Sequence, residues 1–185
     1  MTKRVVMAAM LSMLMAGTAM AQEGKSEVSI AGNMTATTTD VGGFTSDATS
    51  TFFYFRMGQY LTSQMVMSGN VSLFGTSSNG GASSNVGTNL GFGLKYYLDG
   101  AAKSALVPFV EGELHMVLLS STTSNITSTM TGGGLSAGVG ASYFITEDVS
   151  ADLSIQGFGD GLTDDYGTDI TQSGVRMLFG LTARY

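Results

Sequence analysis

The sequence predicts an all-β protein, an eight-stranded antiparallel up-and-down β-barrel that crosses a membrane and is preceded by a signal peptide. Three observations predict it. Apolar and polar residues alternate in eight segments, the connections between these segments alternate between short and long, and residues 1–21 have the pattern of a secretory signal. Alternation with a period of two is typical of a strand that has one apolar face.

The signal peptide is the first element. Residues 1–21 begin with Lys3 and Arg4, continue with an apolar run over 5–17 and end on Ala19-Met20-Ala21. A charged start, a short apolar middle and an A-x-A site are the parts of a secretory signal. The run is shorter than the ~20 residues that span a bilayer. We therefore expect a signal peptide over 1–21 and one barrel domain over 22–185.

Composition excludes several classes of protein. Without Lys3 and Arg4 the net charge falls from −6 to −8, which disfavours nucleic acid as a partner. The chain has no cysteine, so it has no disulfide framework. It has one histidine, so a histidine-based metal cluster is excluded as well. Abundant glycine, a single proline and many serine and threonine residues favour strands over helices.

The alternating segments are the predicted strands. They lie at 27–38, 51–61, 65–75, 87–98, 106–119, 133–145, 149–159 and 172–185. A tilted strand needs about 9–11 residues to cross a bilayer, and these segments have that length plus short extensions.

The connections sort into two kinds. Those at 62–64, 99–105 and 146–148 are short, whereas those at 39–50, 76–86, 120–132 and 160–171 are longer and polar. Short turns at one end and long loops at the other are the layout of a bacterial outer-membrane barrel.

Each strand has an apolar and a polar face. In the seventh, Leu153 and Ile155 alternate with Asp152 and Ser154. The apolar face could line a soluble barrel or contact lipid. Three tyrosines decide for lipid, because they lie on the apolar face at the short-turn end, where an aromatic girdle meets the headgroups. This predicted girdle consists of Tyr96, Tyr143 and Tyr185.

The chain resembles a known group of proteins at its corners and at its last strand. The stretches "YFITEDVSADLSI" and "GLKYYL" resemble the periplasmic corners of the eight-stranded outer-membrane barrels, the OmpA transmembrane domain, OmpX, OmpW and opacity-like proteins. The last strand resembles the C-terminal signal that the barrel assembly machinery recognises, with Phe179, Leu181 and Tyr185 as its residues. The resemblance implies a bacterial outer-membrane location, with outer-membrane lipid and lipopolysaccharide as surroundings and that machinery as a partner.

Charged residues are predicted to face the lumen. An eight-stranded barrel is just wide enough for side chains to fill it. The inward charges could form a selectivity ring or could pair and plug the lumen, and we favour pairing of Arg56 with Glu111 and Glu113. Inward glycines of the fourth and sixth strands would leave room for water. The predicted lumen network is Arg56, Lys95, Glu111, Glu113, His115, Asp152 and Arg176, with Glu27 and Arg184 also inward.

Three functions remain open. The first is a structural or surface-interaction barrel whose lumen is largely plugged; the second is a small channel for ions or small hydrophobic molecules. The third and remote one is a lipid-modifying enzyme that would use His115 as a base beside Glu113. We expect no enzymatic activity and no cofactor, and the oligomeric state stays open. Weak candidates for a Ca²⁺ or Mg²⁺ site are Asp160, Asp164, Asp165 and Asp169.

Overall fold

The computed structural model describes residues 25–41, 44–78, 83–98, 105–123, 126–167 and 169–185. The predicted signal peptide and most of the predicted turn at 99–105 lie outside these residues. No helix of the described part is long and apolar enough to cross a membrane.

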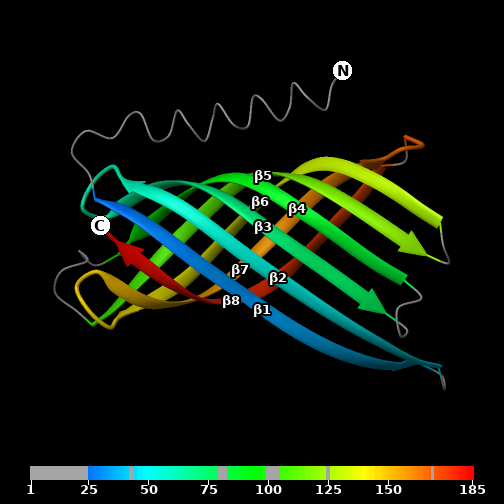
Figure 1. Cartoon of the computed structure of the whole chain (residues 1–185), viewed down its shortest axis with the longest axis horizontal. Coiled ribbons are helices and arrows are strands. Elements are labelled where there is room, and N and C mark those ends of the chain that lie inside the picture. Colours follow the sequence, from blue (N-terminus) through cyan, green and yellow to red (C-terminus); the bar gives the residue numbers. More distant parts are fainter. Residues whose placement is uncertain (1–24, 42–43, 79–82, 99–104, 124–125, 168) are drawn as a thin grey trace.

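The described residues form eight strands, which confirms the predicted all-β class (Figure 1). The strands are β1 (Ser26–Val41), β2 (Phe44–Tyr60), β3 (Met65–Ser78), β4 (Ser83–Tyr97), β5 (Leu106–Thr123), β6 (Ile126–Phe144), β7 (Val149–Asp164) and β8 (Asp169–Arg184).

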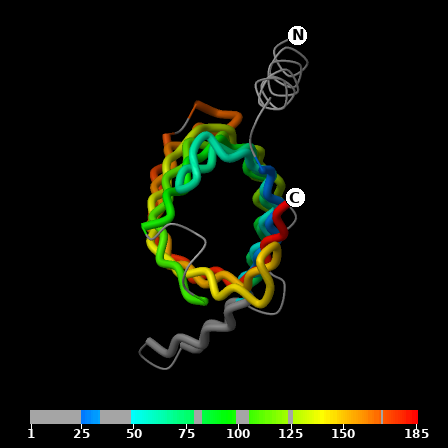
Figure 2. The backbone as a smooth tube through the Cα atoms, turned by 90° about the vertical axis from the view of Figure 1, so that its left-hand side faces the viewer, coloured from blue at the N-terminus to red at the C-terminus, as the bar shows by residue number. Residues whose placement is uncertain are grey.

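The strands close into one antiparallel barrel in chain order, as predicted. β1 completes the ring against β8, from Glu27 opposite Arg184 to Gly32 opposite Phe179. Figure 2 looks into the ring along the strands. Ser26, Tyr185 and the turns at 61–64 and 145–148 lie at one end of the barrel, called here the terminal end. The opposite end is called the distal end.

Two turns at the terminal end repeat one local structure. In the turn after β2, the hydroxyl oxygen of Thr62 accepts hydrogen bonds from the backbone N–H groups of Gln64 and Met65. Thr146 does the same for Asp148 and Val149 after β6. A threonine that accepts bonds from the next backbone amides stabilises a tight turn. This explains why L-T-S-Q-M and I-T-E-D-V both reverse the chain.

The prediction of four long polar loops at the distal end is wrong. The described parts of 39–50, 76–86, 120–132 and 160–171 instead lie mostly in strands, which pair up to Val41 opposite Phe44 and Thr123 opposite Ile126. Beyond the lipid both faces of a strand meet water, so pairing continues without apolar alternation. Threonine, which is frequent here, suits a strand. The strands are therefore longer than predicted, up to the 19 residues of β6.

Large apolar side chains cover the outside of the barrel. Leu114 and Val175 are 68% and 74% exposed, and Phe53, Leu135, Leu153 and Phe179 are exposed in the same way. Exposed apolar surface of this extent is what a barrel presents to lipid. The predicted outward orientation of the apolar face is confirmed.

Inside the barrel, buried apolar side chains gather toward both ends. The terminal layer consists of Val66, Tyr97, Val107 and Phe109, with Tyr60 and Phe144 packed against them. The distal layer consists of Val117, Leu119 and Leu162, with Phe74, Met130 and Ile170 packed against them. A third cluster, Phe52, Tyr54 and Leu178, lies between the two layers.

Inward glycines make room for large side chains, and not for water as predicted. A Cβ at Gly140 of β6 would lie 2.8 Å from Cε2 of Phe109 and 2.5 Å from the carbonyl oxygen of Leu153. A Cβ at Gly174 of β8 would lie 2.9 Å from Cζ of Phe158. The phenyl rings thus lie over the glycines of other strands. In a barrel this narrow, a bulky inward residue needs a residue without a side chain beside it.

Replacing an inward glycine tests this packing. Gly140→Ala places a methyl group against Phe109 and a carbonyl oxygen, and we expect a loss of about 1–3 kcal/mol of unfolding free energy from overpacking. Gly157→Ala is the matched control, because its Cβ would point outward, with the nearest atoms, the carbonyl oxygens of Ala137 and Gly174, 4.0 Å away. Urea unfolding in lipid vesicles compares the two. Equal stability of both variants would contradict the packing described.

A second pair of variants tests the lipid-facing surface. Leu153→Arg puts a charge on the outer face of β7, where Leu153 is 44% exposed, and we expect a loss of about 2–4 kcal/mol if it lies near the bilayer midplane. Thr163→Arg lies on the same face of β7 near its distal end, so its loss should be about 0–1 kcal/mol. Urea unfolding in vesicles measures the free energy of both variants. A larger loss for Thr163→Arg than for Leu153→Arg would contradict the assignment of the middle of β7 to the membrane interior.

Candidate functional site: the polar lumen

The candidate site is the polar interior between the terminal and distal layers. Strand alternation turns every second residue of β2, β4, β5, β7 and β8 inward, and these positions carry the charges. Arg56, Lys95, Glu113 and His115 are each less than 10% exposed. Charges with so little access to water need partners.

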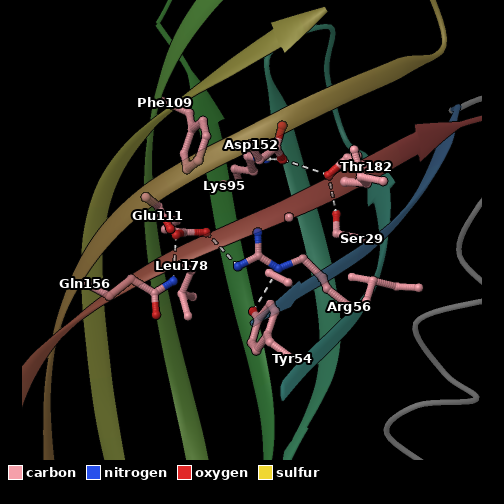
Figure 3. Close-up of a pocket in the computed structure, with 15 residues that line it drawn as sticks. Ser29, Tyr54, Arg56, Lys95, Phe109, Glu111, Asp152, Gln156, Leu178 and Thr182 are labelled. Atoms are coloured by element: carbon pink, nitrogen blue, oxygen red, sulfur yellow. Dashed lines mark hydrogen bonds and ion pairs between the residues drawn. The ribbon is translucent and has the colours of Figure 1, made fainter. Parts of the chain in front are cut away.

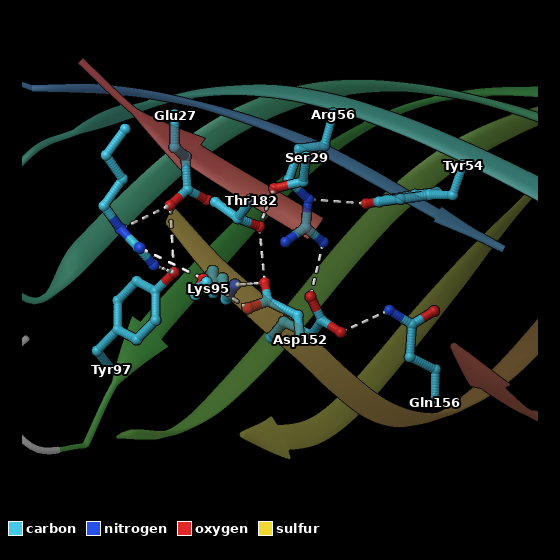
Figure 4. Close-up of polar contacts among 12 residues, drawn as sticks. Glu27, Ser29, Tyr54, Arg56, Lys95, Tyr97, Asp152, Gln156 and Thr182 are labelled. Atoms are coloured by element: carbon cyan, nitrogen blue, oxygen red, sulfur yellow. Dashed lines mark hydrogen bonds and ion pairs between the residues drawn. The ribbon is translucent and has the colours of Figure 1, made fainter. Parts of the chain in front are cut away.

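Arg56 of β2 is the centre of the first group of contacts. Its Nη2 donates to Oε2 of Glu111 at 2.7 Å, and its Nε donates to the Tyr54 hydroxyl at 2.9 Å (Figures 3 and 4). Nε2 of Gln156 donates to the other oxygen of Glu111 at 2.6 Å. Both carboxylate oxygens of Glu111 are therefore satisfied, from β2 on one side and β7 on the other.

Arg56 does not pair with Glu113, contrary to half of the predicted pairing. The Tyr54 hydroxyl lies between them, because it accepts a bond from Arg56 and donates to Oε2 of Glu113 at 3.0 Å. The buried Tyr54 hydroxyl therefore supplies a hydrogen-bond partner to the Arg56 guanidinium and to the Glu113 carboxylate. The second carboxylate is thus linked to Arg56 only indirectly.

Lys95 of β4 is the centre of the second group. Its Nζ donates to Oδ2 of Asp152 at 3.0 Å and lies 4.0 Å above the ring of Phe109. Ser150 and Thr182 also donate to Asp152, at 2.8 Å and 2.7 Å. One carboxylate on β7 therefore collects three donors from three strands (Figure 4).

Arg184 of β8 is the centre of the third group, at the terminal end. It donates to the hydroxyls of Tyr60 and Tyr97 at 2.7 Å and 2.9 Å, and both phenols donate to the same oxygen of Glu27. The direct distance from Nε of Arg184 to that oxygen is 4.0 Å. The two phenols thus bridge the charges across the terminal layer.

His115 of β5 is the centre of the fourth group, toward the distal end. Its Nε2 lies 2.8 Å from Oδ1 of Asp160, and its Nδ1 lies 3.4 Å from Oε1 of Glu113. Gln172 donates to the other oxygen of Asp160 at 3.1 Å. This group joins β5, β7 and β8.

Arg176 of β8 differs from the other cations. Its Nε donates to Gln156 at 2.8 Å, and its guanidinium lies 4.3 Å from the ring centre of Phe52 and 5.5 Å from that of Phe158. Within the described part of the chain, no carboxylate lies within ion-pair distance of it. Aromatic faces attract guanidinium groups, so this cation is stabilised mainly by rings, with Glu113 as its strongest carboxylate neighbour beyond ion-pair distance.

A small cavity remains between the first two groups (Figure 3). Its volume is about 30 Å³, and its lining includes Arg56, Lys95, Glu111 and Asp152. Roughly 10–15 Å³ is enough for one water molecule, so the cavity has room for about two. The two ion pairs and this space form the middle of the lumen.

The tyrosine hydroxyls are the polar groups that sequence reasoning missed. Tyr54, Tyr60 and Tyr97 point inward, and their phenols connect the charged groups. Their position on the polar face, with Tyr54 two residues from Arg56 and Tyr97 two residues from Lys95, was the available signal. Gln156, which joins Glu111 to Arg176, was also missed.

The four candidate metal-binding aspartates do not form a site. Asp160 lies in the lumen against His115, whereas Asp165 accepts a bond from the Thr129 amide and Asp169 accepts one from the Thr163 hydroxyl. Asp164 caps its own turn by accepting from the Tyr166 amide. Among the residues that the structure describes, no three acidic, histidine or cysteine side chains are placed to hold a metal ion.

The aromatic and terminal residues of the sequence prediction lie outside. Tyr96, Tyr143 and Tyr185 are exposed on the outer face at the terminal end, as are Phe179 and Leu181 along β8. The Tyr96 hydroxyl donates to Gln64 in the adjacent turn. The roles of these residues as girdle and assembly signal stay predictions.

Comparison with known proteins identifies a family of the same architecture. The model of the family described as outer membrane protein beta-barrel domain matches residues 6–179. Among curated proteins, no sequence matches significantly.

Three solved structures illustrate the shared fold. Neisserial surface protein A is 15% identical with a TM-score of 0.64, covering 89% of this chain and 100% of its own. The N-terminal barrel domain of Pseudomonas aeruginosa OprF is 15% identical with a TM-score of 0.60, covering 88% and 100%. The Yersinia pestis attachment invasion locus protein Ail, in complex with the heparin analogue sucrose octasulfate, is 12% identical with a TM-score of 0.52, covering 89% and 100%.

The Arg56–Glu111 pair supplies a test of the lumen energetics. Arg56→Ala leaves Glu111 buried without its cation, and we expect a loss of about 3–5 kcal/mol of unfolding free energy. Adding Glu111→Gln should recover part of this loss, whereas adding Glu113→Gln should not, because Glu113 does not contact Arg56. Urea unfolding of the wild type, the single variants and the double variants in vesicles measures the coupling. If the losses of Arg56→Ala and Glu111→Gln simply add in the double variant, the two side chains are not energetically coupled and the ion pair is contradicted.

Proposed function

Because the chain belongs to the outer membrane protein beta-barrel family and lies in the bacterial outer membrane, we propose that it acts there as a closed barrel with a structural or surface-interaction role. In this arrangement the terminal end faces the periplasm and the distal end faces outward, since the polar segments are longer at the distal end, at 39–50, 76–86, 120–132 and 160–171, and the longer connections of such barrels are extracellular. The lumen is proposed to be largely plugged by its own side chains.

The observation that carries this proposal is the four groups of paired charges across the lumen. They include both signs at similar depth, so they satisfy one another instead of forming a ring of one sign that would select ions. The distal layer lies beyond these groups at one end, and the terminal layer, which includes the tyrosines of the Arg184 group, lies at the other. The cavity between them, about 30 Å³, is far smaller than a conduction path needs.

A surface role is favoured by the relatives and by the chemistry of the distal end. One relative is named as a surface protein and another as an attachment and invasion protein, and none of those described above is named as an enzyme. The heparin analogue bound to Ail is not carried over to this chain. None of the segments 39–50, 76–86, 120–132 and 160–171 holds a lysine or arginine, and 39–50 and 160–171 hold aspartates, so a polyanion would be repelled. A neutral or basic surface partner fits better.

The alternative is a small channel, favoured by the polar cavity between Arg56, Lys95, Glu111 and Asp152. Single-channel recording in planar bilayers separates the two functions. We expect the wild type to be silent at neutral pH. The variant Tyr97→Ala/Phe109→Ala, which thins the terminal layer, is the comparison that should give conductance steps. Stable steps from the wild type would overturn the closed barrel in favour of the channel.

A further inference from the structure

His115 is the single histidine of the chain and lies between two carboxylates. A neutral imidazole has one N–H, so it can donate to Asp160 or to Glu113 but not to both. An imidazolium has two, one for each partner. The 2.8 Å contact of Nε2 with Asp160 is a hydrogen bond, whereas the 3.4 Å contact of Nδ1 with Glu113 is an ion-pair contact without a hydrogen bond, and it is favourable only when the ring is protonated.

The surroundings offer little other positive charge to these carboxylates. The second oxygen of Glu113 accepts from the Tyr54 hydroxyl of β2, and the second oxygen of Asp160 accepts from Gln172 of β8. Arg56 is bound to Glu111, and Arg176 lies against aromatic rings but also attracts Glu113 and Asp160 electrostatically, beyond ion-pair distance. The walls from β3, β4 and β6 at this level contribute the neutral Asn70, Gly91 and Gly134. His115 is the cation in direct contact with both carboxylates, so its charge has the largest effect on the repulsion between Glu113 and Asp160.

The contact also has a mechanical consequence. His115 on β5 reaches Asp160 on β7 across β6, where Gly134 stands opposite both residues in the register and has no side chain to separate them. The next inward residues of these two strands are Val117 and Leu162, which pack in the distal layer. If His115 and Asp160 move apart, β5 and β7 carry Val117 and Leu162 apart as well, and the distal layer is disturbed.

We propose that His115 is a proton-operated clamp on the distal half of the lumen. With its proton, it holds β5 and β7 together and keeps the distal layer packed. When pH rises and the ring releases its proton to water, its ion pairs with Glu113 and Asp160 are lost. The two carboxylates then repel each other more strongly, and the layer loosens and takes up water. The proposal rests on the proposed closed barrel, because loosening the distal layer changes the lumen only if that lumen is otherwise closed.

The first test follows stability against pH between about pH 5 and 9, the range in which histidine usually titrates. The full chain is folded in vesicles, and urea unfolding is measured beside the NMR resonance of the single imidazole. The unfolding constant should rise with pH, by at most about tenfold per pH unit for one proton, in step with that resonance.

Two variants separate the clamp from a merely structural contact. His115→Gln carries no titrating charge, so its unfolding constant should be flat over this range. Asp160→Asn leaves one carboxylate for a neutral imidazole to satisfy, so its pH dependence should be strongly reduced while the fold is kept. If His115→Gln has the pH profile of the wild type, or if the resonance titrates without any change in stability, the clamp is wrong.

The second test measures the distal layer itself. The chain has no cysteine, so Val117→Cys introduces a unique thiol at a side chain that is 1% exposed. Its labelling rate by a methanethiosulfonate, relative to exposed Ser173→Cys, should rise with pH in the otherwise wild-type chain and stay constant when Asp160→Asn is added. A relative rate that never changes with pH overturns the proposal. Conductance of the wild type at neutral pH would instead overturn the closed barrel, so the two failures are distinguishable.

Discussion

Every backbone N–H and C=O group that enters lipid must find a partner within the protein, and this constraint governs the whole molecule. A sheet meets it only by closing, so β1 must pair with β8 after the other strands have paired in sequence. Closing eight strands leaves a narrow interior. Whatever points inward must then fit around its neighbours, which is why phenyl rings such as Phe109 and Phe158 lie over glycines of other strands.

The same narrowness determines how charges are accommodated. In the centre of a wide pore, water would solvate Arg56 or Lys95 and no partner would be needed. Here each carboxylate of the middle lumen is held by donors from at least two strands, and Glu111 is held from both β2 and β7. A charge buried away from water is tolerated only when hydrogen bonds and an opposite charge compensate for its lost hydration. The polar interior therefore ties together strands that do not touch through their backbones.

Tyrosine has a special part in this interior. Its ring fills space like phenylalanine, and its hydroxyl accepts from a guanidinium while donating to a carboxylate. Tyr54 does this between Arg56 and Glu113, and Tyr60 and Tyr97 do it between Arg184 and Glu27. Packing and charge compensation are thus achieved by the same side chains, which makes the lumen a single connected structure and gives a closed barrel a physical basis.

Period-two alternation is a local property, so the sequence by itself determined the all-β class, the positions of the strands and the side of the sheet on which Leu153 or Asp152 lies. It also determined most of the charges that share the lumen, with Asp160 as the exception. It could not determine the distal ends of the strands, because strands in water need no apolar face and segments such as 120–132 therefore look like loops. Nor could it choose Glu111 over Glu113 for Arg56, or place His115 beside Asp160. Those contacts join β2 to β5 and β5 to β7, strands that are not neighbours. Their depth in the lumen depends on the stagger accumulated around the closed barrel, which only the tertiary structure decides.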